Sequence, residues 1–304
     1  MVTSMYAAIA GLRTHQSKMD VISNNIANVN TWGYKSKSAN FQDAMYNNMI
    51  ISTEGDVEGG GLGGVNASQV GYGVGLGSIS ANFGTGSWGF TGRGTDCMID
   101  GTGFFIVGPM LEAGTTDAAD LTDAGLSLSR VGIFSVDGNG YITDNQGNYV
   151  YGFEPDPANP EAFLTDNLVP IRIPEDPTST TTPKERYDIQ TLAIGTDGRI
   201  AGVDSENQKI TIGQIAVASV ENVNGLVQTA GYLFDIGNNA GQVSAIQTVA
   251  TTTGKIMSNY LEMSNVDLAT DMANMITTQR GYQANSKIIT VTDEMLEQLV
   301  NMKR

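Results

Sequence analysis

Residues 264–302 read SNVDLATDMANMITTQRGYQANSKIITVTDEMLEQLVNM. Apolar residues recur in this stretch at alternating steps of four and three, and residues 263–302 contain one glycine and no proline. The Ser-Asn-Val-Asp start offers several candidate helix caps. The pattern predicts a helix of about 35 residues, roughly 50 Å long. Its stripe comprises Leu268, Met272, Met275, Gln279, Tyr282, Ser286, Ile289, Asp293, Leu296 and Val300, widened by Ile288, Met295, Leu299 and Met302.

The N-terminal segment predicts a second helix with a matching stripe. A helix as long as the C-terminal one is unusual in a compact domain, and its near-3.5-residue repeat favours a coiled-coil-like partner. Exposed apolar surface costs about 25 cal/mol per Å². We therefore expect each stripe to cover the other, or copies of the other. The N-terminal stripe consists of Ile9, Leu12, Gln16, Met19, Ile22, Ile26 and Val29.

Asparagines accumulate where the N-terminal helix should end. Asparagine favours caps and turns because its side chain bonds nearby backbone groups. We expect these side chains to bond the backbone where the chain turns outward, and to bond neighbouring copies of the chain. The residues concerned are Asn24, Asn25, Asn28 and Asn30, followed by Trp32, Gly33, Tyr34 and Lys35.

The charge of the chain is concentrated in its middle. The formal net charge is −16. Residues 1–50 hold four Lys/Arg against two Asp/Glu, and residues 260–304 hold four against six, so the middle 209 residues carry the whole −16. This pattern suggests packed ends and a hydrated middle, and it argues against binding to nucleic acid.

The middle of the chain predicts β structure. Short apolar runs alternate with Asp-Gly and Asn-Gly pairs at 137–138, 139–140 and 197–198 and with Gln-Gly-Asn at 146–148, all of which predict hairpins. The predicted class is α+β: terminal amphipathic helices (1–34 and 260–304) form a coiled-coil-like inner domain, with one discontinuous all-β outer domain between them. Residues 35–80 are expected to form an extended Gly-rich linker. The β domain covers 81–259, with a Pro-rich surface excursion at 154–185.

Motifs for chemistry are weak, so no catalytic, cofactor-binding or metal site is predicted. The stretch 137–148 lacks the twelfth-position glutamate of a calcium loop. The glycine runs at 59–64 and 71–77 lack the context of a phosphate loop. His15 is expected at a helix surface or subunit contact, and Cys97 as a small buried hydrophobe. No apolar run suits a membrane span and no cleavable signal peptide is evident, so export without one is expected.

Both ends of the chain resemble the flagellar axial proteins, the rod and hook family. The similarity lies in SNNIANVNTWGYKS at 23–36, in FTGRGTDCMIDGTGFFIV at 90–107, in FSVDGNGYITDNQGNYVYGF at 134–153 and in the stretch from Ser264 to the end of the chain. The resemblance implies that the terminal helices of many copies build an inner tube with the β domain outside it. The implied helix contacts include Val266 and Leu299 beside the stripe residues.

Within this family, the C-terminal pattern is closest to hook subunits, with the distal rod as the alternative. The implied role is a curved tube that serves as a universal joint between rod and filament. Implied partners are further copies of the chain, rod, hook-cap and hook-filament junction proteins and the flagellar export apparatus. The implied location is extracellular, in the hook or basal body.

A different class of protein remains open at this point. A secreted β-rich enzyme or glycan-binding module would also be acidic and rich in strands. Its carboxylates are not grouped with an aromatic cleft, and Trp88 is the one tryptophan of the β region. Tube formation without turnover would distinguish the two classes.

Overall fold

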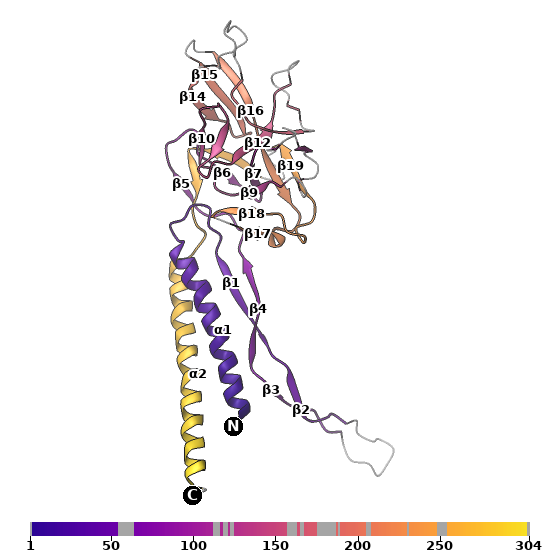
Figure 1. Ribbon diagram of the computed structural model, residues 1–304, viewed down its shortest axis with the longest axis vertical. Helices are drawn as coiled ribbons and strands as arrows, with labels where there is room; N and C mark the ends of the chain where they lie inside the picture. The colour runs from indigo at the N-terminus through magenta and orange to yellow at the C-terminus, as the bar shows by residue number, and fades with distance from the viewer. Residues whose placement is uncertain are drawn as a thin grey trace. The chain divides into compact units, whose positions relative to one another are not determined.

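The chain forms two compact units, which are described separately here. A computed structural model describes residues 2–53, 64–111, 116–117, 121, 125–156, 163–164, 167–174, 187, 189–204, 208–229, 231–247 and 254–302 (Figure 1). The first unit holds residues 1–29, 36–82 and 266–304, and the second holds 30–35 and 83–265. Residues 59–63 of the glycine run and much of the Pro-rich 154–185 stretch lie outside the described residues.

The first unit contains both helices, packed side by side (Figure 1). They are α1 (Val2–Ala27) and α2 (Leu268–Met302), and α2 has the 35 residues that its sequence pattern predicts. Asp267 caps α2: its carboxylate accepts hydrogen bonds from the backbone N–H groups of Ala269 and Thr270, at 3.0 and 3.4 Å, and from the Thr270 hydroxyl. These bonds lower the pKa of Asp267.

Residues 35–80 differ from the expected linker, because their described part is largely paired into strands. Strand β1 (Lys37–Asp43) pairs with β4 (Val74–Ala81), and β2 (Tyr46–Ile50) pairs with β3 (Ser68–Gly71), all antiparallel. The pairing places apolar residues opposite each other, such as Phe41 and Leu76. Backbone ladder bonds therefore order a glycine-rich sequence that has no periodicity of its own.

The described part of the second unit has 17 strands, of which 13 form one sheet with antiparallel pairings and four form two separate two-stranded sheets. Alternate residues of β7 and β16 enter two different apolar clusters: Phe105 and Val217 lie in one, and Phe104 and Ala218 in the other. Both faces of these strands are therefore buried. The strands are β5 (Trp88–Phe90), β6 (Cys97–Asp100), β7 (Phe104–Gly108), β8 (Thr116–Asp117), β9 (Ser127–Ser129), β10 (Phe134–Val136), β11 (Ile142–Asp144), β12 (Tyr149–Phe153), β13 (Asn167–Pro170), β14 (Ile189–Ile194), β15 (Arg199–Asp204), β16 (Lys209–Val220), β17 (Val227–Gln228), β18 (Leu233–Asp235), β19 (Val243–Gln247), β20 (Lys255–Ser258) and β21 (Tyr260–Glu262), with a short 3-10 helix, η1 (Val223–Gly225).

The predicted hairpins are confirmed. Turns join β10 to β11, β11 to β12 and β14 to β15, and each has a glycine with positive φ: Gly140 at 74°, Gly147 at 85° and Gly198 at 74°. The 137–148 stretch thus makes two hairpin turns. Cys97 is fully buried in β6, as expected, and burial raises the pKa of its thiol.

Candidate assembly surface

The two helices meet through small and polar residues. A Cβ atom added to Gly11 would lie 2.6 Å from the Nδ2 atom of Asn285, and one added to Gly281 would lie 2.7 Å from the His15 ring. The buried residues of α2 are Thr278 and Thr292. The closest approach of the helices therefore occurs where side chains are shortest, on a face that is offset from the apolar stripe of α2.

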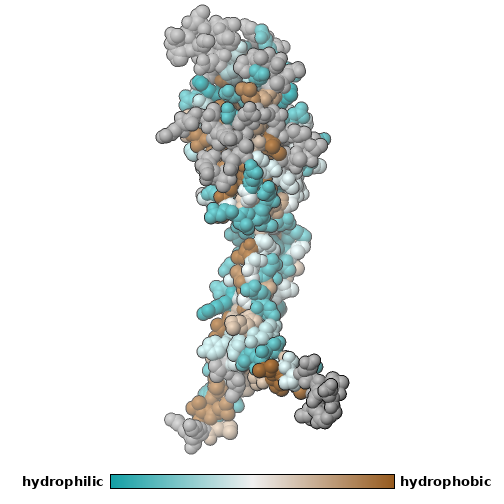
Figure 2. Space-filling view, turned by 90° about the vertical axis from the view of Figure 1, so that its right-hand side faces the viewer, coloured by the Kyte–Doolittle hydropathy of each residue, from teal (hydrophilic) through white to brown (hydrophobic). Residues whose placement is uncertain are grey.

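The apolar stripe of α2 is largely exposed in the single chain. Met272 is 50% exposed, Leu296 36% and Leu299 46%, and Val300 reaches 68%. Figure 2 shows apolar side chains at the surface of the unit that holds the helices. Within one chain the two stripes therefore cover each other only in part, because glycine and threonine give the closest helix contact. The alternative, that copies of the chain cover the stripes, stays a prediction.

The remaining predicted helix contacts lie in different environments. On α2 and just before it, Leu268, Gln279 and Tyr282 are exposed, whereas Val266, Met275 and Ile289 are half-buried. The N-terminal stripe is better covered, since α1 also contacts β1 and β4. Ile22 is buried and Gln16 is exposed, and the half-buried members are Ile9, Leu12, Met19, Ile26 and Val29.

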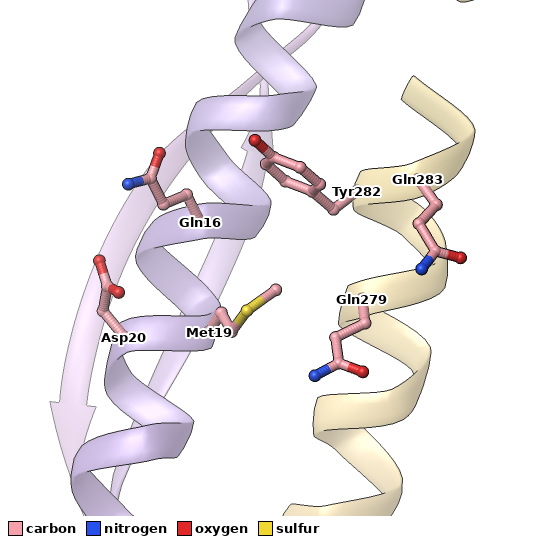
Figure 3. Close-up of a pocket in the computed structure, with 6 residues that line it drawn as sticks. All are labelled: Gln16, Met19, Asp20, Gln279, Tyr282 and Gln283. Atoms are coloured by element: carbon pink, nitrogen blue, oxygen red, sulfur yellow. The ribbon is translucent and has the colours of Figure 1, made fainter. Parts of the chain in front are cut away.

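A groove of about 430 Å³ runs between α1 and α2. Met19 and Tyr282 point into the space between the helices (Figure 3). The other lining residues are Gln16, Asp20, Gln279 and Gln283. Apolar surface and amide groups together suit a mixed side-chain contact better than a charged substrate.

Asparagines order the end of α1 through backbone contacts. Asn25 is 2% exposed and forms two bonds with Lys37: its Nδ2 donates to the Lys37 carbonyl at 2.8 Å, and its Oδ1 accepts from the Lys37 N–H at 3.0 Å. Asn28 donates to the carbonyl of Asn24 at 2.9 Å. Asn25 thus mimics a strand partner for the first residue of β1 and fixes where the chain leaves the helix. Asn30 is exposed.

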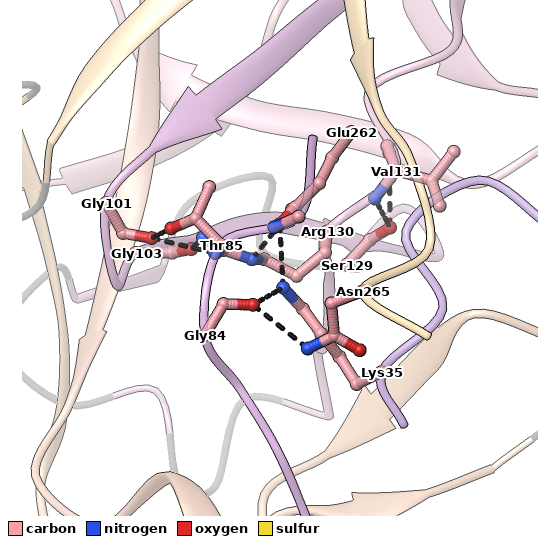
Figure 4. Close-up of polar contacts among 11 residues, drawn as sticks. Lys35, Gly84, Thr85, Gly101, Gly103, Ser129, Arg130, Val131, Glu262 and Asn265 are labelled. Atoms are coloured by element: carbon pink, nitrogen blue, oxygen red, sulfur yellow. Dashed lines mark hydrogen bonds and ion pairs between the residues drawn. The ribbon is translucent and has the colours of Figure 1, made fainter. Parts of the chain in front are cut away.

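A buried ion cluster in the second unit joins segments from both ends of the chain (Figure 4). Lys35 Nζ lies 2.7 Å from Glu262 Oε1, and Arg130 Nε lies 3.2 Å from Glu262 Oε2. All three side chains are nearly inaccessible to solvent. We call Lys35, Arg130 and Glu262 the buried clasp.

Backbone groups complete the buried clasp. Lys35 donates to the Gly84 carbonyl, and Arg130 donates to the carbonyls of Gly101 and Gly103. Gly33 N–H donates to the Glu262 carbonyl at 2.8 Å. Burial, with the nearby Arg130 charge, lowers the pKa of Lys35, and burial also lowers the pKa of Arg130. The clasp therefore holds two cations with one carboxylate, which makes Glu262 the residue on which both depend.

Lys35 and Gly33 were among the motif residues that the sequence singled out, whereas Glu262 and Arg130 were missed. Glu262 lies 227 residues from Lys35 along the chain. In the sequence, Glu262 follows Tyr260 and Leu261 at the end of an apolar run. A carboxylate at such a position needs a cation if it is buried. That local pattern gives no indication of which cation.

His15 of α1 packs between α2 and β1. Its ring lies edge-on to Phe41 of β1, with centroids 5.5 Å apart, and it fills the space left by Gly281 of α2. Its Nδ1 atom is buried without a hydrogen-bond partner. Neither Phe41 nor Gly281 titrates, and Lys18 of α1 is the charged group that acts on the ring. Burial and the Lys18 charge lower the pKa of His15 from 6.5.

We expect the first unit to lose stability in mild acid. The unfolded chain titrates near pH 6.5 at His15 and the folded chain titrates lower, so the unfolded state binds the extra proton as the pH falls below about 6.5. The measurement is an NMR titration, in which the single histidine of the chain gives one imidazole signal. A His15→Gln control should remove this part of the pH dependence. A measured pKa of His15 at or above 6.5 would contradict the burial of its ring between Phe41 and Gly281.

The β2–β3 ribbon also exposes apolar side chains. Met49 is 67% exposed, Ile51 74% and Val70 51%. A two-stranded ribbon is marginal in water by itself, and these side chains lack cover among the residues that the structure describes. The ribbon therefore adds a second apolar surface to that of α2.

Two further features bear on chemistry and membranes. Within the described ranges, no group of three or more His, Cys, Asp or Glu side chains is placed to hold a metal ion. The described helices include none with both the length and the apolar character that crossing a membrane requires.

Comparison with known proteins connects these surfaces to one family. Residues 257–302 match the family model described as flagellar basal body rod FlgEFG protein C-terminal, and residues 5–35 match the flagella basal body rod protein model. The chain is 36% identical to the flagellar basal-body rod protein FlgG of Bacillus subtilis (strain 168), with both chains covered completely. It is 30% identical to FlgG of Buchnera aphidicola subsp. Schizaphis graminum, over 98% of this chain and 99% of the relative. The flagellar hook protein FlgE of Treponema pallidum is 26% identical over 467 aligned positions, with both chains covered completely.

Proposed function

Since the chain belongs to the flagellar basal-body rod and hook family, whose members are structural and not enzymatic, we propose that it is a distal rod subunit. The observation that carries self-assembly is the exposed apolar stripe of α2, with Met272, Leu296 and Leu299 all between 36 and 50% exposed. Such a contiguous apolar surface on a soluble chain typically marks a protein contact.

The comparisons favour a rod subunit over a hook subunit. The C-terminal sequence pattern by itself favours the hook. The rod relative from Bacillus subtilis aligns over 305 positions, close to the 304 residues of this chain. The hook relative needs 467 positions, so it holds sequence that this chain lacks. The pattern at 264–302 was a weaker guide, because rod and hook share much of it.

In this proposal, the helices of many copies pack as the inner wall of a tube. The stripe residues of α1 and α2, the groove between them and the β2–β3 ribbon make the contacts between copies. Residues 81–259 form the outer part, whose acidic surface stays hydrated. Partners are further copies and other rod and hook components, and the flagellar export apparatus delivers the chain.

Electron microscopy of the purified chain, concentrated until it polymerises, tests the proposal. We expect straight, unbranched tubes. Tubes that curve and supercoil would support the hook interpretation instead. A chain that stays monomeric at all concentrations, with its α2 face exposed, would contradict assembly of either kind.

A further inference from the structure

Two aromatic side chains stand exposed on the small β5–β21 sheet of the second unit. Trp88 is 60% exposed and Phe90 71%. The strands pair Trp88 with Glu262 and Phe90 with Tyr260. The other aromatic side chains that the structure describes in this unit are buried or half-buried, with Phe104 and Phe134 each 1% exposed. Trp88 and Phe90 are therefore more exposed than the other aromatic residues described in this unit.

Neighbouring groups pack against Phe90 and against the backbone between the two exposed aromatics. Phe90 packs edge-on against Tyr260, with centroids 5.5 Å apart. Gly89, between the two aromatics, lies against the Trp32 ring, so closely that a Cβ atom would come within 2.7 Å of it. Met263 is 38% exposed and donates its N–H to the Ser87 carbonyl at 2.8 Å. We call Trp88, Phe90, Tyr260 and Met263 the aromatic patch.

The buried clasp fixes the base of the aromatic patch. Glu262, opposite Trp88, is 2% exposed and bound to Lys35 and Arg130. A rigid aromatic surface loses little conformational entropy when it is covered, which favours binding. At these exposed fractions, the patch presents roughly 300 Å² of apolar surface, which is within the range of the largest apolar patch on a typical monomer, a patch that is often functional.

The position of the patch along the chain connects it to the helices. Trp32 follows the last residue of the first unit's opening segment, Val29, by three positions. Met263 precedes Val266, where the first unit resumes, by the same number. Met263 of the patch, and the Trp32 ring that lies against Gly89, are therefore within a few residues of α2 and α1 along the chain.

The chemistry around the patch matches another copy of the chain. Residues 86–92 read GSWGFTG and carry no charge, although the unit is strongly acidic. The next residue is Arg93, whose side chain is 58% exposed and only loosely paired with Asp96 at 3.8 Å. The exposed α2 stripe combines apolar side chains such as Leu299 with the carboxylate of Asp293, which is also exposed. The patch combines apolar side chains with a cation, and the α2 stripe combines apolar side chains with a carboxylate. The two surfaces are therefore chemically complementary.

We propose that the aromatic patch is covered by a second copy of this chain in the polymer. The assembly surface then extends from the helices onto the β-rich unit. This inference rests on the proposed function, since it assigns one more contact to the same self-assembly. The contact would couple the outer unit of one subunit to its neighbour.

Tryptophan fluorescence tests the patch directly, because the chain has two tryptophans. In a Trp32→Phe variant, Trp88 is the sole reporter, and a Trp88→Phe variant supplies the Trp32 background. We expect polymerisation to shift the Trp88 emission to shorter wavelength and to reduce its quenching by acrylamide at least threefold. A polymer in which Trp88 is quenched as in the monomer would overturn this inference and leave self-assembly intact. Failure to polymerise would overturn both.

A second variant keeps the test independent of the reporter. Phe90→Ser should raise the critical concentration for polymerisation about tenfold, with the monomer still folded. The matched control is Val136→Ser, which removes an apolar side chain that is 43% exposed in β10, outside the patch. We expect the control to polymerise like the parent chain. Equal effects of the two variants, or none from Phe90→Ser, would contradict the inference.

Discussion

Glu262→Gln is expected to lower the free energy of unfolding of the β-rich unit by about 3–5 kcal/mol, the cost of breaking a buried ion pair from one side. The substitution keeps the shape of the side chain and removes its charge. Lys35 and Arg130 then remain buried as two cations without the carboxylate that is paired with both of them. The amide oxygen can still accept from Lys35 and from the Gly86 N–H, but an amide NH2 group replaces the carboxylate oxygen that lies 3.2 Å from Arg130 Nε.

The effect of Glu262→Gln should depend on pH in a defined direction. Glu262 is the group that raises the pKa of Lys35 against burial and the Arg130 charge. Without it, that pKa falls further below its usual 10.5, while Lys35 in the unfolded chain still titrates near 10.4. The unfolded state then binds more protons over this window, so stability rises with pH. The deficit of the variant should therefore be largest near neutral pH and shrink toward about pH 10.

Urea unfolding followed by tryptophan fluorescence measures this prediction, because Trp32 and Trp88 both belong to the β-rich unit. The matched control is Glu221→Gln, the same substitution at an exposed carboxylate of that unit. It should change stability by no more than about 0.5 kcal/mol. The prediction is wrong if the free energy of unfolding of Glu262→Gln lies within about 1 kcal/mol of that of the parent chain. It is also wrong if the loss of stability grows with pH, and in either case the buried clasp does not stabilise the β-rich unit as proposed.

Local patterns predicted the regular elements well. The stripe and the Ser-Asn-Val-Asp caps before it located α2, and the Asp-Gly, Asn-Gly and Gln-Gly-Asn turns located three hairpins. These signals succeed because a helix or a tight turn depends on residues within a few positions of one another. The packing of the two terminal helices was also predicted, although the residues at their closest contact were not.

Long-range pairing explains what the sequence did not predict. The β1–β4 ladder joins Lys37 to Ala81 across a glycine-rich stretch, and nothing in either strand specifies the other. The buried clasp joins residues separated by up to 227 positions. The helix contact through Gly11 and Gly281 was missed because small residues add nothing to an apolar stripe, yet they set where two backbones approach most closely.

Leu296→Asp is expected to raise the critical concentration for polymerisation at least about 100-fold. In the single chain, Leu296 is 36% exposed and is followed on the same surface by Leu299 and Val300, so an aspartate there costs the monomer little. If copies of the chain cover this surface, the carboxylate is buried without a cation in every subunit. That cost is several kcal/mol, and each 1.4 kcal/mol corresponds to about tenfold in affinity.

Sedimentation of the polymer against concentration measures the effect, and circular dichroism of the monomer verifies that α2 is retained. Gln298→Asp is the matched control, because it adds the same charge two residues away at an exposed position outside the predicted stripe. We expect the control to change the critical concentration less than about fivefold, or under 1 kcal/mol. If Gln298→Asp blocks polymerisation as strongly as Leu296→Asp, added charge anywhere on α2 is enough and the stripe is not the contact. If neither does, the exposed face of α2 remains in water in the polymer, and the contacts between copies must be made by the ribbon and the β-rich unit.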